Sequence, residues 1–212
     1  MPDSFYYRAA ANLPWTSAML QAAPMTMPNF GFQLGHSTYT WEFHVLPTGV
    51  DGSLYVTDYY GFNRFASHFP YGGTIYYDQG NIDGLGRLTW NPPAGFFNAV
   101  HHVVFQADFE NQIRRIYIDG VLVATAGGVP NTYPQGGFFG PDNLYLTFVQ
   151  GGMGEVRYWN YARTVDQINA TRNVALSGPQ PGLVAVWRCD ERGAPGTPVL
   201  DRSGNNFHGF IS

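Results

Sequence analysis

The 212-residue sequence has little charge and carries no basic run. Charged residues make up 12 %, and 11 Lys and Arg against 15 Asp and Glu leave a net charge of -4. A chain with so few cations has little to neutralise a phosphate backbone, which excludes nucleic acid as a partner. Because no stretch approaches the roughly 18 uninterrupted apolar residues of a membrane span, we expect no such span.

Cysteine is almost absent as well, since Cys189 is the single one. A lone thiol cannot form an internal disulfide. The N-terminal stretch MPDSFYYRAAANLPW also lacks the basic region followed by an apolar core that marks a signal peptide. The sequence therefore favours a cytoplasmic protein or one released without a signal peptide, and an extracellular protein if a leader has been removed.

Material for β-structure is abundant. Hydrophobic residues make up 44 % and aromatic residues 17 % of the chain, which also holds 26 Gly and 15 Pro. Strand-forming residues separated by turn-forming residues are typical of folds with many short strands. A length of 212 residues also suits one large sandwich. We therefore predict a single all-β domain over residues 1–212, in which residues 1–36 form an irregular arm or edge strands.

The first clear strand signal covers residues 39–47. Its alternation places Trp41 and Phe43 on one face and Glu42 and His44 on the other, as in a strand with one buried face. Similar runs recur along the chain, each bounded by Gly, Pro, Asn or Asp. Regular strands with turns between them predict a sandwich or a barrel.

Two local sequence signals predict a hairpin turn and a helix. Asp119 and Gly120 stand between two alternating runs and supply the positive φ angles that a tight hairpin turn demands. The segment ARTVDQINATRN has the only convincing helical pattern, which predicts one short helix near residues 164–173.

Several segments together resemble one known family. They are YTWEFHV, AVHHVVFQAD with IYIDGVLVA, MGEVRYWNYARTVDQI, and LVAVWRCDERGAPGTPVLDRSGNNFHG, and they occur in the family's order. On these residues the chain resembles the laminin-G-like, pentraxin-related jelly-roll domains of the concanavalin A-like lectin/glucanase superfamily. The resemblance implies an antiparallel two-sheet jelly-roll β-sandwich.

The sequence departs from the family pattern at four positions. Val100 replaces a Trp, Gly154 an Asp, Cys189 an aromatic residue and Arg192 a Gly. Because calcium sites are built from carboxylate and amide oxygens on loops, an acid missing at position 154 weakens the implied pentraxin-like calcium site.

Carbohydrate recognition requires an aromatic face to cover a sugar ring, with carboxylates and amides to bind its hydroxyl groups. One region of the sequence offers this combination. The predicted carbohydrate-binding residues are His68, Tyr71, Tyr76, Asp78, Asn81, Asp83 and Trp90. For Trp90, packing at the rim of the sandwich is as good an explanation as stacking on a sugar.

A second oxygen-rich loop lies near the C-terminus. Asp201 and Asn205, with Ser203 and Asn206 beside them, would suit a hard cation, so calcium is a predicted cofactor there. The alternative is a turn in which Asp and Asn bond their own backbone, and the sequence favours it because three of the four donors are neutral.

Catalytic patterns are weak. Glu42, Glu110, Glu155 and Glu191 do not form the E-x-D-x-x-E arrangement of laminarinase-like glycosidases, and the adjacent His101 and His102 fall on opposite strand faces. We therefore predict a non-catalytic lectin whose partner is a glycan and whose affinity a homo-oligomer would raise. A structural or adhesion module is the alternative, followed by a glycoside hydrolase or lyase with an unfamiliar carboxylate arrangement.

Overall fold

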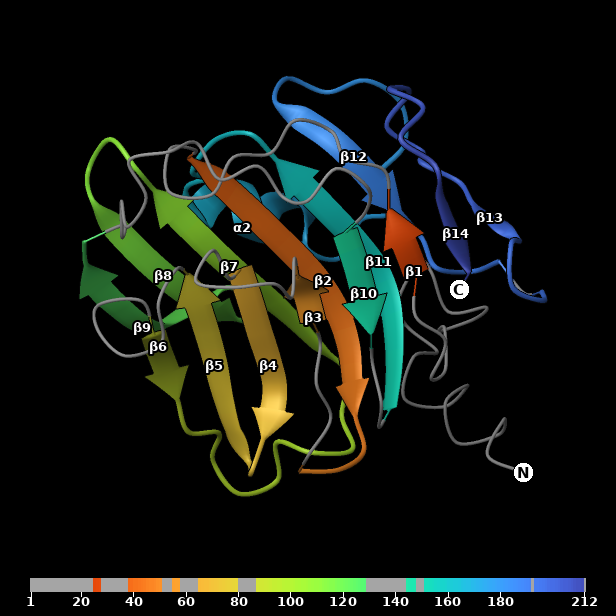
Figure 1. The fold of residues 1–212 in the computed structure, drawn as a ribbon. Coiled ribbons are helices and arrows are strands. Elements are labelled where there is room, and N and C mark those ends of the chain that lie inside the picture. Colours follow the sequence, from red (N-terminus) through yellow and green to blue (C-terminus); the bar gives the residue numbers. More distant parts are fainter. Residues whose placement is uncertain are drawn as a thin grey trace.

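Antiparallel strands form nearly all the regular structure of this protein, as a computed structural model shows (Figure 1). The structure describes residues 25–27, 38–50, 55–57, 65–79, 87–128, 144–147, 151–191 and 193–211. Within these ranges, no helix has the length and hydropathy needed to span a membrane.

The largest sheet has six strands in the order β12-β11-β2-β7-β8-β9, and every neighbouring pair is antiparallel. Its strands are β2 (Tyr39–Pro47), β7 (His101–Asp108), β8 (Ile113–Ile118), β9 (Val121–Gly127), β11 (Gly151–Trp159) and β12 (Leu183–Trp187).

The opposing layer consists of two smaller sheets, with strand orders β13-β14-β1-β10-β3 and β4-β5-β6. Strand β3 lies next to β4, and Figure 1 shows β4, β5 and β6 in front of the six-stranded sheet. The strands are β1 (Met25–Met27), β3 (Tyr55–Thr57), β4 (Phe65–Tyr71), β5 (Thr74–Gln79), β6 (Arg87–Trp90), β10 (Leu144–Thr147), β13 (Pro198–Val199) and β14 (Gly209–Ile211).

Aromatic side chains from both layers fill the space between them. Within the six-stranded sheet, the Trp41 ring lies 4.6 Å from Tyr158 and 6.5 Å from Trp187. Across the two layers, the ring of Tyr77 on β5 lies 5.2 Å from that of Phe105 on β7. Burial of each large apolar side chain stabilises the fold by about 1.5–3 kcal/mol. The predicted inner face of residues 39–47 is therefore confirmed, and with it the two-sheet β-sandwich.

The predicted hairpin joins β8 to β9. Asp119 and Gly120 have φ angles of 51° and 80°, which lie in the left-handed region that such a turn requires. Gly120 is needed for a second reason, because a Cβ there would collide with the side chain of Asn169. Asn169 donates a hydrogen bond to the Gly120 carbonyl at 3.2 Å, so the turn is fastened to the helix.

The predicted helix is also confirmed, as α2 (Val165–Thr171). Thr164 caps its N-terminus, and the Gln167 side chain accepts from the Thr164 backbone N–H in a reciprocal capping box. Ile168 is buried against Val104 and Tyr117, so α2 covers part of the outer face of the six-stranded sheet.

The N-terminal segment differs from its prediction where the structure describes it. Met25–Met27 form β1, which pairs with β10 on one side and β14 on the other, so this strand is internal to its sheet and not at an edge. The rest of residues 1–36 lies outside the described ranges.

Candidate functional site

Aromatic and charged side chains from neighbouring strands lie together on the outward face of the three-stranded sheet β4-β5-β6. His68 of β4 pairs in register with Tyr76 of β5, and Asp78 of β5 pairs with Arg87 of β6. Because successive side chains of a strand alternate between its faces, Tyr77 points the other way, into the core. The strand pairing therefore unites residues that are up to 19 positions apart in sequence.

Three rings on this face, those of His68, Tyr71 and Tyr76, form what we call the aromatic cluster. The centroid of His68 lies 5.7 Å from Tyr71 and 5.9 Å from Tyr76, and the two tyrosine rings are 6.5 Å apart. Tyr71 stands at the β4–β5 turn and is 59 % exposed, whereas His68 is buried. The cluster thus presents one supported and accessible aromatic surface, the feature a sugar ring needs for stacking.

Asp78 does not lie at the surface, which corrects its predicted role as a ligand-binding carboxylate. Its side chain is fully buried. The Arg87 guanidinium donates to it twice, from Nε to Oδ1 at 2.6 Å and from Nη2 to Oδ2 at 2.7 Å. His68 Nε2 lies 3.9 Å from Asp78 Oδ2. The guanidinium carbon of Arg87 also lies 4.6 Å from the Tyr76 ring centroid, so the ion pair supports the aromatic cluster through a cation–π contact with Tyr76.

Trp90 is separated from the cluster. It pairs in register with Ile75 and packs on the core, with its ring 5.3 Å from Phe96. Since Ile75 and Tyr76 are neighbours on β5, they face opposite sides of the sheet. The structure thus favours packing at the rim for Trp90, and its role as a stacking platform stays a prediction.

Two further predicted residues, Asn81 and Asp83, lie outside the described ranges. Their proposed contact with a glycan stays a prediction.

The C-terminal loop uses its oxygen atoms within the protein. Asp201 accepts hydrogen bonds from the backbone N–H groups of Val186, Ser203 and Phe207, and from the Ser203 hydroxyl, at 2.8–3.1 Å. Asn205 donates its amide to the carbonyls of Leu183 and Val184. A calcium ion would have to displace these donors.

This geometry favours the hydrogen-bonded turn, and the role of Asp201 and Asn205 as metal ligands stays a prediction. Over the described residues, no cluster of three or more His, Cys, Asp or Glu has a geometry suited to a metal ion. Calcium as a cofactor elsewhere in the chain stays a prediction.

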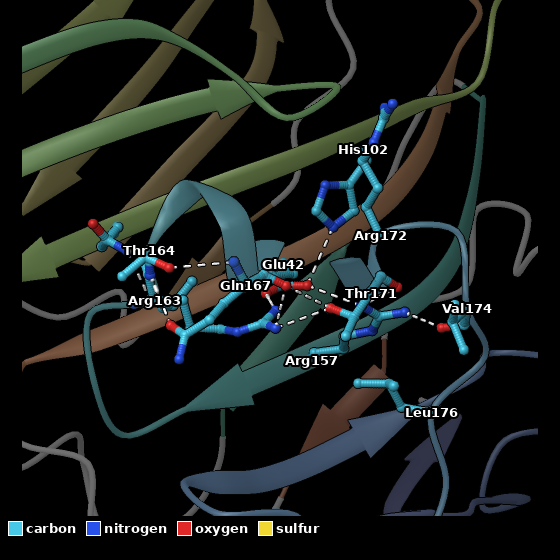
Figure 2. Close-up of polar contacts among 12 residues, drawn as sticks. Glu42, His102, Arg157, Arg163, Thr164, Gln167, Thr171, Arg172, Val174 and Leu176 are labelled. Carbon is cyan, nitrogen blue, oxygen red and sulfur yellow. Dashed lines mark hydrogen bonds and ion pairs between the residues drawn. The ribbon is translucent and has the colours of Figure 1, made fainter. Parts of the chain in front are cut away.

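A buried ion network under α2 was not anticipated from the sequence. The Glu42 carboxylate lies between two guanidinium groups, with Arg157 Nη1 at 3.0 Å from Oε2 and Arg163 on Oε1 (Figure 2). His102 Nε2 reaches Oε2 at 3.2 Å, and Arg157 Nε also binds Glu155 at 2.5 Å. The alternation placed Glu42 on the face opposite Trp41 and Phe43, and α2 and the segment after it cover that face.

The arginines of this network also fasten the helix. Arg157 donates to the carbonyls of Thr171 and Val174 at 3.1 and 2.6 Å, and Arg163 donates to the Gln167 carbonyl at 2.7 Å. The carbonyls of Thr171 and Val174 lie at the last residue of α2 and just beyond it, where the helix supplies no donor of its own. The Gln167 carbonyl lies within the helix and also accepts from the Thr171 hydroxyl. The two arginine side chains thus neutralise Glu42 and also donate hydrogen bonds to carbonyl groups of the helix and the segment after it.

Burial and charge set the titration of these groups. Burial alone would raise the pKa of Glu42, but the hydrogen bond from His102 and the charges of Arg157 and Arg163 outweigh it and hold that pKa well below its usual range. Burial lowers the pKa of His44 and of His102, and the charge of Arg157 acts in the same direction on both, whereas the hydrogen bond and charge of Glu42 oppose the shift at His102. Burial raises the pKa of Glu155. The network therefore contains an ionised Glu42 and neutral histidines.

The buried carboxylates offer no catalytic pair to a substrate. Glu42 and Glu155 are both fully buried and bound by Arg157. Asp108, which with Glu110 was the other acidic pair considered, accepts from Asn111 and Arg115 in the β7–β8 turn. A glycosidase needs carboxylates that flank the sugar, and these contribute to packing and turns instead.

Comparison with known families settles the classification. The sequence profile described as "Concanavalin A-like lectin/glucanases superfamily" matches residues 21–169, more than half of the chain. This protein belongs to that superfamily. None of the curated proteins gives a significant match.

Solved structures share the fold at low sequence identity. A provisionally assigned carbohydrate binding protein from Bacteroides ovatus aligns with a TM-score of 0.55 and 16 % identity, over 90 % of this chain but only 58 % of its own length. Domain 4 of an extracellular arabinanase from Geobacillus stearothermophilus, in complex with arabinotriose, aligns with a TM-score of 0.53 and 15 % identity over 72 % of this chain and 74 % of that one. Both share the fold of this chain.

The first prediction concerns the ion network. Glu42→Gln removes the charge that two buried arginines share, so we expect the free energy of unfolding to fall by about 3–5 kcal/mol in chemical denaturation. Glu110→Gln, at an exposed position, is the matched control and should change stability by less than about 0.5 kcal/mol. Equal effects of the two variants would refute the structural role of Glu42.

The second prediction concerns pH. The folded-state pKa of His102 lies below the unfolded value of about 6.5, so the stability it contributes is present above pH 6.5 and is lost as pH falls. Each such histidine adds up to about 1.4 kcal/mol per pH unit to the slope. His102→Gln, which can still donate to Glu42, should therefore flatten the dependence of unfolding free energy on pH between 7 and 5.

The raised pKa of Glu155 acts in the opposite sense above about pH 4.5, so the comparison of the two proteins, and not the absolute slope, isolates His102. An unchanged slope in the variant would show that His102 titrates as it does in the unfolded chain.

Proposed function

We propose that this protein is a non-catalytic carbohydrate-binding protein that takes glycans on the aromatic cluster of His68, Tyr71 and Tyr76. The observation that carries the proposal is the Tyr71 ring, which is 59 % exposed and backed by two further rings on one sheet face. The apolar side of a pyranose stacks on such a ring, and neighbouring polar groups bind its hydroxyls.

The fold supports this proposal without specifying the sugar. A domain of the same architecture is known in complex with arabinotriose, so a sandwich of this kind is able to carry a glycan site. The buried carboxylates of Glu42 and Asp78 are bound by arginines, which favours recognition over hydrolysis.

A broad glycan array with labelled protein, in calcium-containing buffer and again with chelator, tests the function directly. Selective signal supports glycan binding, and its loss with chelator would support the predicted calcium. Silence in both buffers would contradict the proposal and favour the alternative of a structural or adhesion module.

The third prediction separates the site from the scaffold. Tyr71→Ala should weaken binding of an array-positive glycan at least about tenfold, which is about 1.4 kcal/mol, in isothermal titration calorimetry. Because the side chain is exposed, unfolding free energy should stay within about 0.5 kcal/mol of the parent protein. Phe210→Ala, at an exposed aromatic residue on β14, is the control and should bind normally.

Tyr71→Phe keeps the ring and should retain most of the affinity. Full binding by Tyr71→Ala would place the glycan elsewhere on the protein.

The fourth prediction concerns Asp78. Since this carboxylate is buried and bound by Arg87, Asp78→Ala should lower unfolding free energy on the order of 1–3 kcal/mol. It should also weaken glycan binding, because Tyr76 loses the guanidinium that packs on its ring. Lost binding with unchanged stability would instead indicate direct contact between Asp78 and the sugar.

A further inference from the structure

The β4–β5 turn places Tyr71 and Thr74 side by side. The two residues pair in register across a turn of two glycines. Gly72 and Gly73 have φ angles of 55° and 78°, the conformation of a tight two-residue hairpin turn. The Gly73 N–H also donates to the Val50 carbonyl at 2.8 Å, which holds the turn against the segment after β2. The exposed Tyr71 ring therefore has Thr74 as a fixed neighbour.

Thr74 lies on the same face of its sheet as the aromatic cluster. Side chains alternate along β5, so those of Thr74 and Tyr76 share one face, and Ile75 between them is buried in the core. Thr89 of β6 pairs in register with Tyr76 and is exposed. Rings and uncharged polar groups therefore share this face.

Asn91, the residue after β6, completes the polar part of the face. The Thr74 hydroxyl donates to Asn91 Oδ1 at 2.9 Å, and this hydrogen bond lies at the surface. A threonine hydroxyl has one donor and two acceptor lone pairs, and a primary amide has two N–H donors. With its proton on Asn91, Thr74 retains its acceptor lone pairs, and Asn91 retains its N–H donors. The bond thus fixes an acceptor and a donor next to each other.

This pair supplies what the aromatic cluster lacks. A ring that stacks on a sugar needs polar partners for the hydroxyl groups, and the predicted partner Asp78 is buried. Thr74 and Asn91 lie at the surface, and their mutual hydrogen bond orients them before a ligand arrives. Less side-chain entropy is then lost on binding.

We propose that Thr74 and Asn91 bind the hydroxyl groups of the glycan, and that the site takes a neutral sugar with two adjacent free hydroxyls. This assignment rests on the proposed function. One sugar hydroxyl donates to Thr74 Oγ1, and its neighbour accepts from Asn91 Nδ2. The apolar side of the same ring stacks on Tyr71.

The charges on this face favour a neutral sugar. Thr74, Asn91 and Tyr71 are uncharged, and the ion pair of Arg87 with Asp78 is closed by two hydrogen bonds. The carboxylate of an acidic sugar would have to compete with Asp78 for that guanidinium. Sugar hydroxyls need only the uncharged donors and acceptors at the surface.

The fifth prediction tests direct contact with the sugar. The probe is the neutral oligosaccharide with the strongest array signal. In isothermal titration calorimetry, Thr74→Val and Asn91→Ala should each weaken its binding about three- to tenfold. Thr74→Ser returns the hydroxyl and should restore binding. Because both side chains lie at the surface, the melting temperature of each variant should stay within about 2 °C of the parent protein.

Analogues of the probe that lack one hydroxyl distinguish contact from a structural effect. In the parent protein, loss of either of two adjacent hydroxyls should weaken binding by a similar factor. The analogue without the hydroxyl that accepts from Asn91 should lose nothing further in Asn91→Ala, because the two changes remove the same interaction. Additive losses for every analogue would overturn the proposal.

Thr125→Val and Asn173→Ala are the matched controls, because they make the same changes at exposed positions on β9 and after α2. Both should bind as the parent protein does. With a selective array signal, unchanged affinity of Thr74→Val and Asn91→Ala would overturn this assignment and leave glycan binding standing. A stronger signal for acidic than for neutral glycans would do the same. Silence of the array would overturn the proposed function and this assignment with it.

Discussion

The ion network around Glu42 constrains the six-stranded sheet and α2 because it lies where the outer face of that sheet would otherwise meet water. An ionised carboxylate is costly to bury unless cations and hydrogen bonds compensate for it, and Arg157 and Arg163 supply both. Both arginines also donate to carbonyls of α2, and Arg157 to the Val174 carbonyl just beyond it. Directional hydrogen bonds, as well as apolar contacts, thereby hold the helix in place on the sheet.

The same logic recurs on a smaller scale under the aromatic cluster. Asp78 is neutralised by Arg87, and the face of that guanidinium packs on Tyr76. Tyr76 in turn lies against His68, whose ring meets the exposed Tyr71. The accessible ring is thus the last member of a chain of contacts that begins at a buried carboxylate. This arrangement gives a surface residue a supported position, which an isolated loop tyrosine would lack.

Much of the fold was predictable because its signals are local. The alternation of residues 39–47, the Asp119-Gly120 turn and the capped helix each depend on residues within one segment, and the structure confirms all three. The β-sandwich followed from the resemblance of several such segments, in order, to one superfamily.

The candidate site was less predictable because it depends on which strands pair. Asp78 reads as a surface acid until Arg87, nine residues later, is placed opposite it. Alternation put Glu42 and His44 on one face of a strand, but it does not specify what covers that face. For Trp90 the sequence left stacking and rim packing open, and only the register with Ile75 shows that its side chain lies on the core side of the sheet.

These buried charges also bear on how such a protein would recognise a ligand. Since Asp78 and Arg87 satisfy one another, the cluster presents rings to an approaching molecule and not an unpaired charge. Stacking and hydroxyl contacts of this kind give short-range and modest affinity per site, with little long-range steering. A protein that relies on them gains most from engaging several sites at once.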